Sequence, residues 1–83
     1  MMNALSNSQI DEAILSVTRA SWSKVARVIV MTDKILGDNL PEGEAGLDLV
    51  AGRIEALVHD GRLLVQGDIK KWRYSEVRKP DSN

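Results

Sequence analysis

The chain has no cysteine and only one histidine among its 83 residues. Without cysteine there are no disulfide bonds and no thiolate metal sites, so stability has to come from packed aliphatic side chains and the two tryptophans. An enzyme needs a nucleophile with a base, a carboxylate pair in a cleft or a metal, and His59 is the single imidazole available. The sequence therefore predicts a protein that is not an enzyme and holds no cofactor.

Long apolar runs are also missing. No stretch approaches the roughly 18 apolar residues that span a bilayer. Residues 1–8 lack the basic start and apolar run of a signal peptide. We therefore expect a cytoplasmic protein with no membrane contact.

Neither sign of charge dominates, since the formal net charge is -1. Residues 19–35 carry four bases and one acid, residues 36–48 carry four acids and no base, and residues 68–79 carry five bases and two acids. This patchwork is weaker than the basic footprint typical of nucleic-acid-binding proteins.

The length and the composition indicate one globular domain. A chain of 83 residues buries about 60% of its unfolded surface and builds a single core. Its hydrophobic content of 43% and charged content of 28% are ordinary for globular proteins. We expect one domain over residues 1–83, with an ordered core of about residues 8–78.

Three segments have helical spacing. Residues 8–18 place Ile10 and Ile14 on one face, with Ser8 as the N-cap. Residues 21–36 predict a second helix, although a β-branched run leaves a strand as the alternative. A loop rich in glycine and acids follows at residues 37–46, and the third helix spans residues 47–60 before the stop signal of Gly61.

The remaining residues predict a β-hairpin over 62–78, with Gly67 and Asp68 as a two-residue type II′ turn. In this register Val65 pairs with Lys70. The side chains expected to face the helices are Leu63, Val65, Trp72 and Tyr74. The apolar side chains expected on the outer face are Leu64, Ile69 and Val77, which need a further strand, the chain terminus or a partner to cover them.

Three helices followed by a two-stranded antiparallel hairpin predict an α+β, mainly α fold that is winged-helix-like. Three segments, at residues 22–29 (WSKVARVI), 53–68 and 73–78 (RYSEVR), resemble an uncharacterised bacterial domain family. Members of that family are usually the carboxyl-terminal part of longer proteins of unknown function. The resemblance covers about residues 8–78 and implies the fold, but it implies no activity and no site residues.

The acidic loop does not predict a metal site. Its oxygen-bearing side chains do not follow the alternating pattern with a central glycine that calcium loops use: Asp38, Asn39, Glu42, Glu44 and Asp48. Residues 43–46 also lack the lysine of a phosphate-binding loop. We interpret the segment as a solvated acidic loop.

The outward face of the third helix is the predicted partner-binding surface. Leu49, Gly52 and Ala56 lie together on it, and small residues four positions apart let another backbone approach closely. The full predicted set is Leu49, Gly52, Arg53, Ala56 and Leu64. The partner is another protein or a second copy of the chain; the alternative is an exposed helix that happens to carry small residues.

Nucleic-acid binding is the alternative function. The residues expected to contact phosphates are Lys24, Arg27, Lys70, Lys71 and Arg73. On the third helix only Arg53 and His59 are suited to base or phosphate contacts, because its acids repel phosphates. The sequence therefore favours a non-catalytic regulatory or protein-interaction module over sequence-tolerant DNA binding through the hairpin. The other interpretation of these basic residues is a solvated face that binds nothing.

Overall fold

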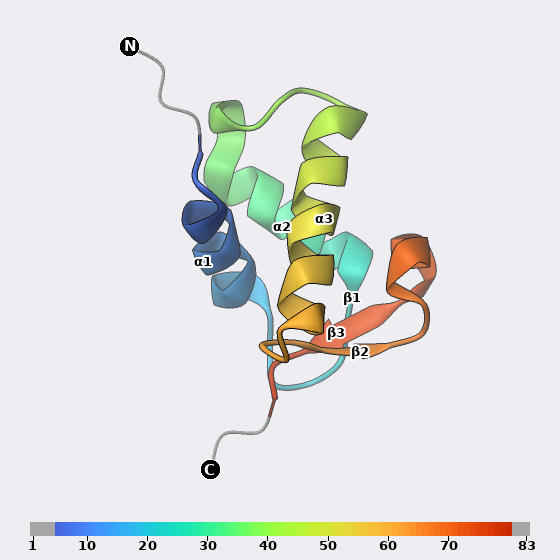
Figure 1. Ribbon diagram of the computed structural model, residues 1–83. Coiled ribbons are helices and arrows are strands. Elements are labelled where there is room, and N and C mark those ends of the chain that lie inside the picture. The colour runs from blue at the N-terminus through green and yellow to red at the C-terminus, as the bar shows by residue number, and fades with distance from the viewer. Residues whose placement is uncertain (1–4, 81–83) are drawn as a thin grey trace.

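Three α-helices and a small antiparallel sheet form the fold (Figure 1). The computed structural model describes residues 5–80. Its elements are α1 (Asn7–Val17), β1 (Ser23–Lys24), α2 (Val25–Leu36), the 3-10 helix η1 (Gly37–Asn39), α3 (Glu44–His59), β2 (Leu64–Gln66), the 3-10 helix η2 (Ile69–Tyr74) and β3 (Glu76–Arg78). This arrangement confirms the predicted α+β, mainly α class.

One apolar core joins the helices to the sheet. The fully buried side chains recur at helical spacing, for example Ile10 and Ile14 in α1 and Val50, Ile54 and Leu57 in α3. Every helix packs against the other two. The apolar faces predicted for the first and third helices are therefore confirmed.

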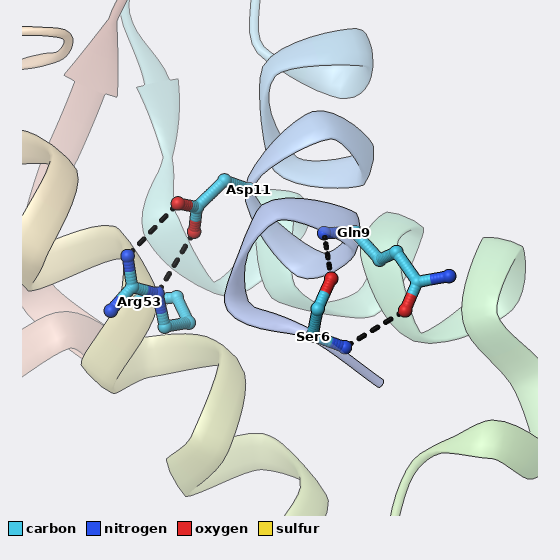
Figure 2. A network of polar contacts seen from close by, with 4 residues as sticks. All are labelled: Ser6, Gln9, Asp11 and Arg53. Carbon is cyan, nitrogen blue, oxygen red and sulfur yellow. Dashed lines mark hydrogen bonds and ion pairs between the residues drawn. The ribbon is translucent and has the colours of Figure 1, made fainter. Parts of the chain in front are cut away.

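Helix α1 begins two residues earlier than its predicted cap implies, because its N-cap is Ser6 rather than Ser8. The Ser6 hydroxyl accepts a hydrogen bond from the Gln9 backbone N–H, and Gln9 Oε1 accepts one from the Ser6 N–H (Figure 2). This reciprocal pair of hydrogen bonds is a capping box, in which the residue three positions after the N-cap is a glutamine. Gln9 selects Ser6, because Ser8 has no Glu or Gln three residues later.

Helix α2 begins at Val25, four residues later than predicted. Ser23 and Lys24 instead form strand β1, which pairs with Val77 and Glu76 of β3. Trp22 therefore lies outside the helix and is 38% exposed, although the helix predicted over residues 21–36 included it. A strand of two residues leaves no readable alternation, so only its distant partner reveals it.

The predicted two-stranded hairpin is wrong in strand number and in register. The sheet has three strands in the order β1-β3-β2, and Val65 pairs with Val77 instead of Lys70. Val77, expected on the outer face, is fully buried in the core. Tyr74, expected to face the helices, is 85% exposed.

A 3-10 helix replaces the expected tight turn between the last two strands. The Asp68 carboxylate accepts a hydrogen bond from the Lys70 N–H and so caps η2. Ile69 and Trp72 are half-buried and pack on the core, although the backbone between them leaves helical geometry at Lys71 (φ -109°, ψ 62°). These two apolar anchors draw the segment onto the helices, which moves the strand pairing to residues 76–78.

Glycines shape both ends of α3. A side chain at Gly46 in the first turn would overlap the Pro41 carbonyl oxygen, so the preceding loop lies directly on the helix backbone. Leu40 of that loop is buried in the core. After the last turn, Gly61 has a φ of 78°, which confirms the predicted left-handed stop.

Candidate functional site

The outward side of α3 carries the residues predicted to bind a partner. Leu49 is 39% exposed, Gly52 is exposed and Ala56 is half-buried. A Cβ placed on Gly52 would meet no other atom within 4 Å, so the helix backbone is open to an approaching molecule at this point. We call this surface the α3 face and define it as Asp48, Leu49, Gly52, Glu55, Ala56 and His59.

Two shallow hollows meet at Gly52. One runs along the helix and is lined by Gly52, Glu55, Ala56, His59 and Asp60. The other separates α3 from η2 and is lined by Asp48, Ala51, Gly52, Glu55, Ile69, Lys70 and Trp72. The two hollows share Gly52 and Glu55 as lining residues and therefore lie next to each other, and we refer to them together as the groove.

The groove has acidic walls on its α3 side. Asp48, Glu55 and Asp60 line it from the helix, and Lys70 faces them from η2. His59 is exposed at the last position of α3, and within residues 5–80 no hydrogen bond joins it to a hydroxyl or a carboxylate. The groove therefore offers backbone, a small apolar floor and carboxylates for binding.

Arg53 differs from the other predicted partner residues because it is engaged inside the molecule. Its Nε and Nη2 donate to Oδ1 and Oδ2 of Asp11, each at 2.9 Å (Figure 2). The hydrogen bond to the Asp11 carboxylate, opposed by burial, raises the pKa of Arg53 above its ordinary value. Arg53 therefore joins α1 to α3, and its guanidinium is engaged inside the molecule.

Leu64 is separate from the groove. It lies in β2, an edge strand of the sheet, and is 37% exposed. Like Leu49 it lines neither of the two hollows at Gly52, but unlike Leu49 it does not belong to α3. Its outward orientation agrees with the sequence expectation, but the structure does not bring it together with Leu49, Gly52 and Ala56.

The residues predicted to contact phosphates are divided among several places. Lys24 and Arg73 line one hollow together with Tyr74, Ser75 and Glu76. Lys71 is exposed two residues before Arg73, at the point where the backbone of η2 departs from helical geometry. Arg27 lies elsewhere and donates from Nη1 to the Val17 carbonyl oxygen at 3.3 Å, and Lys70 faces α3.

We call the surface formed by Lys24, Arg73 and Tyr74, which line one hollow, the basic surface, and we include Lys71 as the exposed lysine two residues before Arg73 in the sequence. Tyr74 was not predicted as a surface residue, because the assumed hairpin register turns it toward the helices. Tyr74 lies between Arg73 and Ser75, and strand alternation allows a buried residue between two polar neighbours, so the sequence carried no signal of its exposure.

Acidic residues do not gather into a metal site in the described part of the chain. Within residues 5–80, no group of three histidine or acidic side chains is arranged to hold a metal ion. Asp33, Asp38 and Glu42 line a hollow beside η1 without forming such a group. Over the same residues, none of the helices has both the length and the apolar character required to cross a bilayer.

Comparison with known proteins gave no relative: no protein-family model, no curated protein and no solved structure matches the chain.

Proposed function

We propose that this domain is a non-catalytic regulatory or protein-interaction module that binds a partner protein through the α3 face. The observation that carries the proposal is the open backbone at Gly52, where a Cβ would have no neighbouring atom within 4 Å and Leu49 is exposed alongside. An exposed glycine inside a helix costs about 0.5–1 kcal/mol relative to alanine. Close approach of another backbone at this glycine would offset that cost.

The charge of the groove specifies the partner. The carboxylates of Asp48, Glu55 and Asp60 favour a segment that carries lysine or arginine. A helix with small side chains facing Gly52 fits the narrow floor, because small residues allow close packing of two helices. We therefore propose a basic helical segment of another protein as the ligand.

A second copy of the chain fits the groove less well. Two α3 faces packed against each other would bring the same carboxylates together, and opposed like charges are destabilising. A symmetric contact repeats each residue on both sides, so the three carboxylates of each copy would be offset by one lysine, Lys70, from each groove. The proposal therefore favours a different protein over a homodimer.

The order of elements is consistent with the proposed winged-helix-like assignment. Helix α1, strand β1, helices α2 and α3, and strands β2 and β3 follow one another, with β3 in the centre of the sheet. In DNA-binding members of such folds, the recognition helix inserts its exposed face into the major groove. Here that position belongs to α3, whose acids disfavour contact with phosphates.

DNA binding through the segment between β2 and β3 is the second candidate. It is favoured by one observation, the shared hollow of Lys24 and Arg73, two cations that are far apart in the sequence. Cations alone supply sequence-tolerant affinity, since phosphate contacts carry no sequence information.

Photo-crosslinking tests the protein-interaction proposal. Benzoylphenylalanine replaces Leu49 in one variant and Ser16, an exposed residue of α1, in the control. In cells that express the protein, we expect a discrete crosslinked product from position 49 and none from position 16. Adding Gly52→Arg should remove the product, because the long cationic side chain fills the groove and opposes a basic partner.

Two results would contradict the proposal. One is equal crosslinking from positions 49 and 16, and the other is a product that persists in the Gly52→Arg variant. Light scattering after size exclusion separates the kinds of partner: we expect a monomer for both wild type and Gly52→Arg. A wild-type dimer that Gly52→Arg dissociates would instead assign the α3 face to self-association.

A further inference from the structure

We infer that the basic surface, Lys24, Lys71, Arg73 and Tyr74, binds single-stranded nucleic acid. The inference rests on the second candidate function and narrows its ligand from DNA in general to unpaired strands. It concerns a different surface from the α3 face, so it adds a site to the proposed protein-interaction module.

The sheet builds this surface from distant parts of the chain. Lys24 precedes α2, and its backbone pairs with Glu76 of β3. The Val25 N–H donates to the Ser75 carbonyl oxygen at 3.0 Å, which joins the start of α2 to the end of η2. Lys24 and Tyr74 are thereby held at one hollow by backbone contacts that do not depend on either side chain.

The cations of the surface are available to an anionic ligand. Among residues 5–80, no ion pair engages Lys24, Lys71 or Arg73. The Arg73 guanidinium lies 4.4 Å from the centroid of the Trp72 ring, a cation–π contact that positions it while leaving its N–H groups free for phosphate. One carboxylate lines the hollow, that of Glu76, and it accepts a hydrogen bond from Gln66 Nε2 at 3.0 Å.

Tyr74 decides between single-stranded and duplex ligands. It is the most exposed large apolar side chain among the described residues, at 85%. Burying an aromatic ring is favourable, so a ring left in water beside cations is suited to a ligand with flat apolar faces. Unpaired bases stack on aromatic side chains in this way, whereas bases in a duplex are already stacked.

The acidic residues at α3 also disfavour a duplex ligand. A duplex seated on a winged-helix-like domain would contact α3, where Asp48, Glu55 and Asp60 repel its phosphates. A single strand is narrower and flexible, so it can follow the basic surface alone. The ligand class is therefore a single strand read by charge and stacking, without strong sequence preference.

Fluorescence anisotropy with labelled oligodeoxythymidylate and oligouridylate tests the inference, with a hairpin duplex as the comparison. Three phosphate contacts predict that affinity falls about 20-fold between about 50 and about 200 mM salt. We expect the single strands to bind at least about fivefold more tightly than the duplex, because only they stack on Tyr74.

Variants identify the surface. Tyr74→Ala should weaken single-strand binding by at least about fivefold, and Tyr74→Phe should retain it, since stacking needs the ring and not the hydroxyl. Lys24→Glu should weaken binding and flatten the salt dependence, whereas Lys34→Glu should do neither. Lys34 is a matched control because it is an exposed lysine about 15 Å away along α2.

The outcomes distinguish a failure of the single-strand inference from a failure of nucleic-acid binding as a whole. Duplex and single strands bound equally, with no effect of Tyr74→Ala, would overturn the inference and leave the second candidate function standing. No binding to any probe at about 100 µM protein and about 50 mM salt would overturn both. Equal losses in Lys24→Glu and Lys34→Glu would also overturn the inference, because the binding would then follow net charge and not this surface. Circular dichroism of each variant confirms that it is folded.

Discussion

Asp11 and Arg53, 42 positions apart, are joined by two hydrogen bonds that connect α1 to α3. Asp11 is 8% exposed, so its carboxylate has little access to water and depends on this partner. A bidentate arginine–carboxylate pair fixes orientation as well as distance. The sequence could not reveal this pair, because helical spacing places each residue on its own helix but does not say which faces meet.

Removing the Asp11 carboxylate should destabilise the fold. Asp11→Ala deletes both charge-assisted hydrogen bonds, and we expect the free energy of unfolding to fall by about 1–3 kcal/mol. Urea denaturation measures the loss. Glu12→Ala, at the exposed neighbouring position, is the control and should change stability by less than about 0.5 kcal/mol. Equal effects of the two variants would show that the pair contributes nothing specific.

The elements follow local sequence signals wherever those signals are long enough to read. The helices come from apolar residues at spacings of three and four, as in Ile10 and Ile14, and their ends come from caps such as Gly61. Strand β1 and the register of β3 were missed because each depends on a distant partner. The core contacts of Ile69 and Trp72 decide the register, and alternation within the strand cannot show them.

Two glycines of α3 have opposite roles, and alanine distinguishes them. Gly46→Ala should lower stability by about 1–3 kcal/mol, because the new methyl group meets the Pro41 carbonyl oxygen. Gly52→Ala should raise stability by about 0.5–1 kcal/mol, because its methyl group enters open space and alanine favours the helix. Thermal unfolding of the two variants measures both changes in stability. A stabilising Gly46→Ala would mean that the loop does not pack on the helix as described.

At the scale of the whole molecule, η2 separates two surfaces of different charge. Its Lys70 and Trp72 line the groove beside α3, while Arg73 and Tyr74 line the hollow beside Lys24. The sequence anticipated the outward positions of Leu49, Gly52 and Ala56 from helical spacing alone. It could not place Lys24 beside Arg73, because that contact comes from the pairing of β1 with β3.

The proposed function depends on binding of a protein partner to the α3 face. The most direct measurement uses the partner protein that photo-crosslinking identifies. This partner is titrated, without a crosslink, into the isotope-labelled domain, and amide chemical shifts of the domain are recorded by nuclear magnetic resonance. We expect the largest shifts at Leu49, Gly52 and Ala56, with Ser16 and Lys34 unchanged. Shifts confined to Lys71, Arg73 and Tyr74, or no shifts at saturating partner, would contradict the account.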